Sequence, residues 1–275
     1  MEDERCVVRE DRHGPALFAA PRAMPHSPNP APGVTEPRAA SRALARAQMV
    51  YDEIHGRTTA YTDFDETQLD GSRQYFDLAA PQLRTLSFDV LTCLVGLEIP
   101  STLQDSLSDR LEEILSILPK STRVYRVDSR LMHWEAHIIR RPGEPVPPFA
   151  LDEVAEIFDG AVSGSQPFGI TYRGFFVSSD GTIAFQGYGE TAHLRSRLGA
   201  AMPFSSPRQN ETGHISGARI LDPVGPDAFR RLLELRRSTQ NDVLGVLPVH
   251  KVKLVLERRW YLEDYTIIKA TDLAS

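Results

Sequence analysis

The sequence predicts an α+β fold built from two similar halves. Segments with strand-like alternation and segments with helical spacing of apolar residues follow one another in mixed order, which is typical of this class. Two stretches, residues 133–142 and 214–223, also align without gaps, so that His133 matches His214. Each stretch is followed by a short loop containing Pro or Gly and then by an apolar segment that begins with an acid. This internal similarity predicts a repeated structural unit.

The composition is that of an ordinary globular protein. The chain has 275 residues, of which 41% are hydrophobic and 25% charged, so one large domain or two small ones can bury a substantial core. The formal net charge of −6 argues against a broad surface for nucleic acid, because phosphate neutralisation needs clustered Lys and Arg. A small basic pocket for one or two phosphates is compatible with this charge.

The sequence also bears on the compartment. The two cysteines, Cys6 and Cys93, predict no disulfide framework, which agrees with a reducing cytoplasm. No apolar run approaches the roughly 18–20 residues that span a bilayer. Glu2, Asp3 and Glu4 lie where a signal peptide carries positive charge, and no apolar core follows them. We therefore expect a cytoplasmic protein without a membrane partner.

The first 84 residues are expected to precede the main domain. Residues 1–38 are rich in Pro, Ala and charge and have few large apolar side chains, which predicts a disordered tail. A tail that docks a partner is the alternative. Residues 39–84 are expected to cover the main domain, with a helix over 39–54 and a short helix near 74–79. The main domain then spans 85–275.

An apolar run and an apolar stripe predict the first strand and helix of this domain. The run over 85–99 ends at Pro100 and is typical of a buried strand. Ser101 or Thr102 then caps a helix. Its inward stripe consists of Leu103, Leu107, Leu111, Ile114, Leu115 and Leu118.

The next strands are predicted over 123–127 and 131–139. Period-two alternation in the second strand produces two unlike faces. One face is apolar and consists of Met132, Trp134, Ala136 and Ile138. The other consists of Leu131, His133, Glu135, His137 and Ile139. Three ionisable groups in a row on one face indicate a functional site, because a purely structural strand has little reason to carry them.

The remaining elements follow from the same patterns of spacing. The predicted helices cover 150–162, 190–201 and 227–237. The predicted strands are a hairpin of 168–177 with 182–188, a strand over 213–221, and a closing hairpin of 250–256 with 260–269.

The pair of histidine motifs predicts acid–base chemistry. A strand-borne His214-x-Ser216 places the imidazole and the hydroxyl on the same face, about 6–7 Å apart along the chain. Two histidines that face one cleft can serve as general base and general acid on opposite sides of a phosphorus centre, because the imidazole pKa of about 6.5 lies near working pH. Hydroxyl groups two residues further on can hold phosphate oxygens without a metal.

The residues His133 and His214-Ile-Ser216, with Arg219-Ile220 after them, resemble the two-histidine (2H) phosphoesterase superfamily, which includes RNA 2′,3′-cyclic phosphodiesterases. The resemblance covers about residues 85–271. It implies two pseudo-symmetric lobes of antiparallel sheet with outer helices around a central cleft. It also implies catalysis by His133 and His214 without a cofactor. Glu135 departs from the family pattern, which has Thr or Ser at this position, and a carboxylate there repels a phosphate unless it is protonated or turned away.

Further residues are candidates for contact with the substrate. Besides Ser216 and Glu135, the candidates for phosphate contact are Arg140, Arg141, Arg219 and Tyr172. The loops 55–84 and 202–212 are expected to set selectivity. The acidic net charge favours a small nucleotide or an RNA end over a long RNA. The predicted function is that of a metal-independent phosphodiesterase acting on a cyclic phosphate or a small nucleotide-type phosphodiester.

Two other interpretations stay open. His133, Glu135 and His137 on one strand face, with His214 nearby, are ligand types that zinc or iron accepts. Alternatively, the chain has lost the chemistry through Glu135 and binds a nucleotide or a partner protein.

Overall fold

The structure is a computed structural model that describes residues 36–274, with side chains from Leu44 onward. The tail predicted over 1–38 lies outside the described residues except for its last three positions, which belong to helix α1 (Glu36–Thr58). This helix confirms the one predicted over 39–54.

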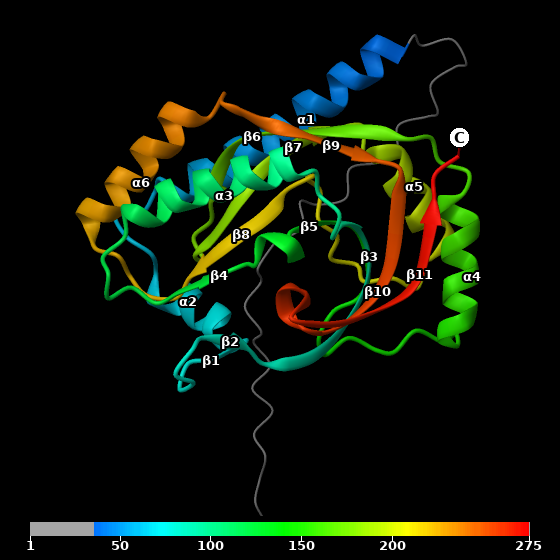
Figure 1. The fold of residues 1–275 in the computed structure, drawn as a ribbon, viewed down its shortest axis with the longest axis horizontal. Coiled ribbons are helices and arrows are strands. Elements are labelled where there is room, and N and C mark those ends of the chain that lie inside the picture. Colours follow the sequence, from blue (N-terminus) through cyan, green and yellow to red (C-terminus); the bar gives the residue numbers. More distant parts are fainter. Residues whose placement is uncertain (1–35, 275) are drawn as a thin grey trace, which may run out of the picture.

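Two antiparallel sheets form the body of the molecule and confirm the α+β class (Figure 1). The four-stranded sheet has the order β11-β10-β3-β5, with bounds Asp264–Asp272, Lys251–Arg259, Ser87–Gly96 and His133–Arg140. The five-stranded sheet has the order β4-β8-β7-β6-β9, with bounds Val124–Arg126, Ile215–Ile220, Thr182–Gly189, Phe168–Val177 and Val243–Val249. A separate small pair consists of β1 (Phe76–Asp77) and β2 (Arg84–Thr85).

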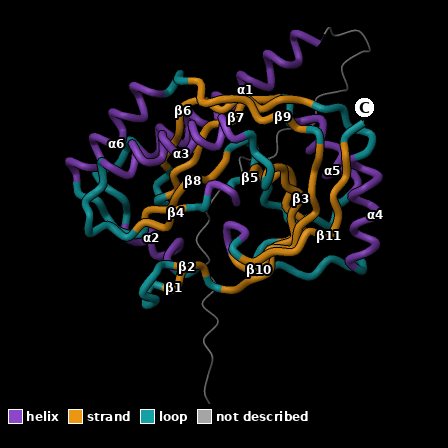
Figure 2. The backbone as a smooth tube through the Cα atoms, viewed as in Figure 1, coloured by secondary structure: helices purple, strands orange, loops and turns teal. Residues whose placement is uncertain are grey.

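Helices cover the outer faces of both sheets (Figure 2). The four-stranded sheet packs against α4 (Leu151–Val162) and α5 (Ala192–Ala201). The five-stranded sheet packs against α3 (Ser101–Ser116) and α6 (Pro226–Thr239). The stripe predicted for α3 is buried, with Leu103, Leu107, Leu111 and Ile114 no more than 1% exposed. None of the helices in the described range is long and apolar enough to cross a membrane.

Helix α1 occupies the other face of the five-stranded sheet. Its Tyr51 packs with Phe176, Ala184 and Tyr188, whereas the neighbouring residue Phe185 belongs to the core on the α3 side. Successive side chains of a strand point to opposite faces, so α1 and α3 sandwich this sheet.

Three local predictions were wrong, and one strand was missed. Neither Ser101 nor Thr102 caps α3, because the N-cap position is Pro100 and no side chain makes a capping hydrogen bond there. The short helix, α2, spans Glu66–Arg73 rather than 74–79, because Asp65 caps it by accepting hydrogen bonds from the main-chain nitrogens of Thr67 and Gln68. Strand β9 was not predicted at all. Residues Trp260–Leu262 form a 3₁₀ turn between β10 and β11, so the last strand begins only at Asp264.

Candidate active site

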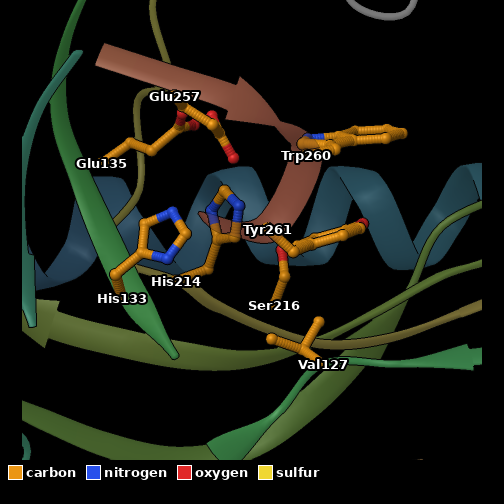
Figure 3. Close-up of a pocket in the computed structure, with 8 residues that line it drawn as sticks. All are labelled: Val127, His133, Glu135, His214, Ser216, Glu257, Trp260 and Tyr261. Atoms are coloured by element: carbon orange, nitrogen blue, oxygen red, sulfur yellow. The ribbon is translucent and has the colours of Figure 1, made fainter. Parts of the chain in front are cut away.

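The two predicted histidines line the same pocket, although His133 lies in β5 of one sheet and His214 directly before β8 of the other (Figure 3). The pocket has a volume of about 40 Å³. A cavity of roughly 10–15 Å³ holds one buried water, so the pocket has room for one small group rather than for a whole nucleotide. Its walls consist of Val127, His133, Glu135, His214, Ser216, Glu257, Trp260 and Tyr261.

His133 is the first residue of β5, and a main-chain oxygen selects its tautomer. Its Nδ1 lies 2.8 Å from the main-chain oxygen of Leu131. A carbonyl oxygen only accepts, so in this contact Nδ1 carries the hydrogen and donates it. In the neutral ring with this tautomer, Nε2 is the nitrogen that can accept a proton.

His214 immediately precedes β8 and is half-buried. Its Nδ1 lies 2.8 Å from the hydroxyl oxygen of Thr212, and its ring meets that of Phe176 edge to face at 5.6 Å. Burial, followed by the positive charge of Arg195, lowers the pKa of His214 to about 4. His214 is therefore neutral in the free protein at neutral pH.

Ser216 and Glu135 face the pocket from opposite walls. Ser216 lies in β8 and is half-buried. Glu135 lies in β5, and its carboxylate accepts a hydrogen bond of 2.7 Å from the Nδ2 of Asn210. The carboxylate that aligns with the hydroxyl of Ser216 is thus neither turned away from the pocket nor paired with a cation among the described side chains.

Glu257 is a second carboxyl group in this pocket, and the sequence reasoning missed it. It lies in β10, is only 2% exposed, and its Oε1 accepts a hydrogen bond of 2.9 Å from the main-chain nitrogen of Leu262. Burial, reinforced by the negative charge of Glu135, raises the pKa of Glu257 to about 8. The available signal was an acid that directly follows the apolar residues 254–256.

The turn after β10 supplies the aromatic wall. Tyr261 and Leu262 have φ values of 58° and 60°, a left-handed conformation that is costly for large side chains. The turn is held because the hydroxyl of Tyr261 accepts a hydrogen bond of 3.1 Å from the Nε of Arg219. The ring of Trp260 stacks on Tyr261 with a centroid distance of 4.9 Å, and both rings face the pocket.

Arg195 of α5 ties the two motif segments together. Its guanidinium donates to the main-chain oxygen of Ala136 at 3.1 Å, to that of Thr212 at 2.7 Å, and to that of Glu135 at 3.4 Å. Burial lowers the pKa of Arg195 to about 10, so it stays charged at neutral pH. It is a residue that the sequence reasoning did not single out.

Four predicted contact residues are not in the pocket. Tyr172 is fully buried, and its hydroxyl donates to the main-chain oxygen of Gly213 at 2.9 Å. Arg219 is 5% exposed and pairs with Asp180 at 2.9 Å.

The other two arginines lie at or beyond the far end of β5. Arg140 pairs with Asp89 at 3.4 Å. The Nε of Arg141 donates to the main-chain oxygen of Arg208 at 3.0 Å. The prediction of substrate contact is therefore wrong for these four residues. None of them lines the pocket, and their polar atoms interact with other groups of the protein.

The course of β5 argues against a metal site made of His133, Glu135 and His137. In its pairing with β3, Leu94 lies opposite Glu135 but Cys93 lies opposite His137, so one residue of β5 is skipped. Such a bulge reverses the alternation, and His137 points to the face opposite Glu135. His137 is 5% exposed and does not line the pocket. No group of three or more His, Cys, Asp or Glu side chains in the described part of the chain is arranged to hold a metal ion.

Comparison with known proteins finds likenesses in structure alone. No protein-family model and no curated protein matches the chain. TT0787 of Thermus thermophilus is similar in structure, with 16% identity and a TM-score of 0.47 over 66% of this chain and 97% of that chain. E. coli LigT complexed with phosphate is similar with 11% identity and a TM-score of 0.44 over 69% of this chain and 100% of that chain.

A third similar structure, described as a phosphoesterase, has 13% identity and a TM-score of 0.44 over 68% of this chain and 100% of that chain. At these identities and scores, structural likeness does not assign an activity to this chain.

Proposed function

We propose that this protein is a metal-independent phosphodiesterase that acts on a cyclic phosphate or another small nucleotide-type phosphodiester. The observation that supports the proposal is the meeting of His133 and His214 in one pocket. These residues are 81 positions apart in the sequence, one in β5 of one sheet and the other directly before β8 of the other, yet they share the pocket with the hydroxyl of Ser216. Two imidazoles around one small pocket provide a base and an acid for one reacting centre.

The hydrogen bonds favour His133 as the general base. Its Nδ1 is committed to the main-chain oxygen of Leu131, so Nε2 can accept the proton of an attacking water. As the water oxygen bonds to phosphorus, the bond from phosphorus to the leaving oxygen breaks, and His214 donates a proton to that oxygen. The hydroxyl of Ser216 donates a hydrogen bond to a non-bridging oxygen.

His214 must acquire its proton when the substrate binds. It is neutral in the free protein because burial and the charge of Arg195 lower its pKa to about 4. A phosphodiester carries one negative charge, and an anion beside an imidazole stabilises the protonated form. Substrate binding therefore raises the pKa of His214, so that His214 becomes protonated and can act as the general acid.

An open groove is lined by residues that neighbour residues of the pocket in the sequence. It has a volume of about 740 Å³. Arg126 and Asp128 in its wall flank Val127 of the small pocket, and Arg259 precedes Trp260. This volume lies in the usual range for small-molecule sites.

Hydrolysis assays test the proposal. Wild type, His133→Ala and His214→Ala are incubated with 2′,3′-cyclic nucleotides and with cyclic oligonucleotides. Turnover by wild type and its loss by about 10²–10⁴-fold in each variant are expected from general acid–base catalysis. The exposed His193, changed to Ala, is the matched control and is expected to leave turnover unchanged.

A second candidate is a nucleotide-binding protein without turnover. The observation that favours it is Glu135, whose carboxylate faces the pocket where a phosphate oxygen is expected to bind. Nucleotide binding by wild type, with no hydrolysis of any of these substrates, supports this candidate and contradicts the phosphodiesterase.

A further inference from the structure

The polar groups of the pocket are unevenly distributed. His214 and Ser216 stand on the β8 side, whereas Glu135 and Glu257 come from β5 and β10 of the other sheet. In Figure 3 both carboxyl groups point into the upper part of the pocket, with His133 and His214 below them. One wall therefore suits a phosphate oxygen and the other repels one.

No lysine or arginine among the described residues lines this pocket. The two arginines whose charges act on His214 are engaged elsewhere. Arg195 donates to main-chain oxygens, and Arg219 binds Asp180 and the hydroxyls of Ser72 and Tyr261. Sites that hold doubly charged phosphate groups normally present such cations directly. Here Asn210, a neutral donor, holds the carboxylate of Glu135 in place.

We propose that Glu135, together with the buried carboxyl group of Glu257, determines specificity by admitting a singly charged phosphodiester and rejecting a doubly charged phosphomonoester. The proposal rests on the proposed function, because it concerns the substrate of that same site. A phosphodiester carries one negative charge, whereas a monoester carries about 1.5–2 at pH 7. The additional charge is repelled by Glu135 across a pocket that is only about 40 Å³ in volume.

Glu257 sets how much negative charge the pocket holds. The groups that face it are Glu135 and His133 from β5, His214 from β8, and Trp260 and Tyr261 from the turn. Because burial and Glu135 raise its pKa to about 8, Glu257 is mostly neutral at pH 7, and Glu135 supplies the single full charge. Ionisation of Glu257 above that pH adds a second charge and strengthens the rejection of anions.

The same arrangement favours release of the product. Hydrolysis of a cyclic phosphodiester converts one negative charge into nearly two while the phosphorus is still in the pocket. Repulsion from Glu135 therefore grows in the step that forms the product. The departure from the family pattern at Glu135 then acts against product inhibition.

Calorimetric titration tests this selectivity. Adenosine 2′-monophosphate is titrated into wild type, Glu135→Gln and Glu135→Thr, and 2′,3′-cyclic AMP is titrated into the same proteins carrying His214→Ala. Affinity for the monoester is expected to rise about tenfold or more when the charge is removed, and affinity for the diester by about threefold or less. Glu135→Asp keeps the charge and is the matched control, with no gain for the monoester.

The outcomes separate this inference from the proposed function. Equal gains for the two ligands, or no gain, overturn the inference while hydrolysis by wild type still stands. A selective gain for the monoester in a protein that does not hydrolyse diesters supports the selectivity and overturns the phosphodiesterase. If neither ligand binds to any of the proteins, the selectivity is overturned, and the hydrolysis assays alone decide on the phosphodiesterase. Thermal unfolding of each variant verifies that it is folded.

Discussion

The hydroxyl of Tyr51 in α1 accepts a hydrogen bond of 2.9 Å from the main-chain nitrogen of Gly187 in β7 and donates one of 3.1 Å to the main-chain oxygen of the same residue. The ring of Tyr51 packs on Phe176 with a centroid distance of 5.6 Å, and Phe176 in turn packs on His214 at 5.6 Å. A helix that precedes the main strands is thereby attached to the sheet face that carries a candidate catalytic histidine.

The change Tyr51→Phe removes both hydrogen bonds while keeping the ring. It leaves a buried main-chain N–H and C=O of Gly187 with one partner fewer, so the free energy of unfolding is expected to fall by about 1–3 kcal/mol. Urea unfolding measures the change. Tyr61→Phe is the control, because Tyr61 is 38% exposed and is expected to change stability by less than about 0.5 kcal/mol. Equal effects of the two changes contradict the role assigned to Tyr51.

The change Arg195→Ala is expected to lower both stability and turnover. It leaves the main-chain oxygens of Ala136 and Thr212 without this donor and removes the link between the segments that carry the two histidines. Arg197→Ala is the matched control on the same helix, because Arg197 donates to Ala161 and Gly160, outside the pocket.

Both arginine variants are expected to lose about 1–3 kcal/mol of stability. Only Arg195→Ala is expected to lower kcat for a cyclic nucleotide, in a steady-state assay well below the unfolding temperature. If the two variants have a similar kcat, the positioning role of Arg195 is contradicted.

The raised pKa of Glu257 predicts that the free energy of unfolding falls as the pH rises towards 8. Its pKa in the folded state, about 8, is above the ordinary value of 4.5, so between these values the folded protein holds a proton that the unfolded chain has lost. His214 and His137, with pKa values lowered to about 4, have the opposite effect, and theirs is confined to pH below about 6.5. Between pH 6.5 and 8 Glu257 is the group of these three that acts.

Urea unfolding at pH 6.5 and pH 8 measures this dependence. Wild type is expected to be less stable at pH 8, and Glu257→Gln, which cannot ionise, is expected to lose less stability over the same interval. The prediction fails if the two proteins lose the same amount. Glu263→Gln is a suitable control, since Glu263 lies outside the histidine pocket.

Arg219 is expected to matter through Asp180 rather than through substrate. Their ion pair, at 2.9 Å, is almost entirely buried. Removing one partner of a buried pair leaves an uncompensated charge and costs about 3–5 kcal/mol, whereas replacing both costs less. Arg219→Met is thus expected to be strongly destabilised in urea, and the double change with Asp180→Asn to recover part of the loss. No recovery in the double variant contradicts the pairing as the cause.

Much of the fold was predictable because local spacing reports the face that an element buries. The apolar run and stripe in 85–118 placed β3 and α3, and alternation placed the beginning of β5. Local spacing failed as a guide where the backbone departs from the regular period, as at the bulge in β5 that turns His137 away from Glu135. It also failed for residues 260–262, where aromatic side chains resemble a strand but the main chain adopts a left-handed turn.

The sequence by itself determined the pair His133 and His214, because the internal repeat is a property of residue order. It also determined that Glu135 stands where the second stretch has Ser216. Only the tertiary structure decided that Glu257 lies in the same pocket as Glu135 and that Arg219 forms an ion pair with Asp180. The reason is physical: the protonation and availability of a polar group depend on burial and on partners distant in the sequence, and neither can be read from local spacing.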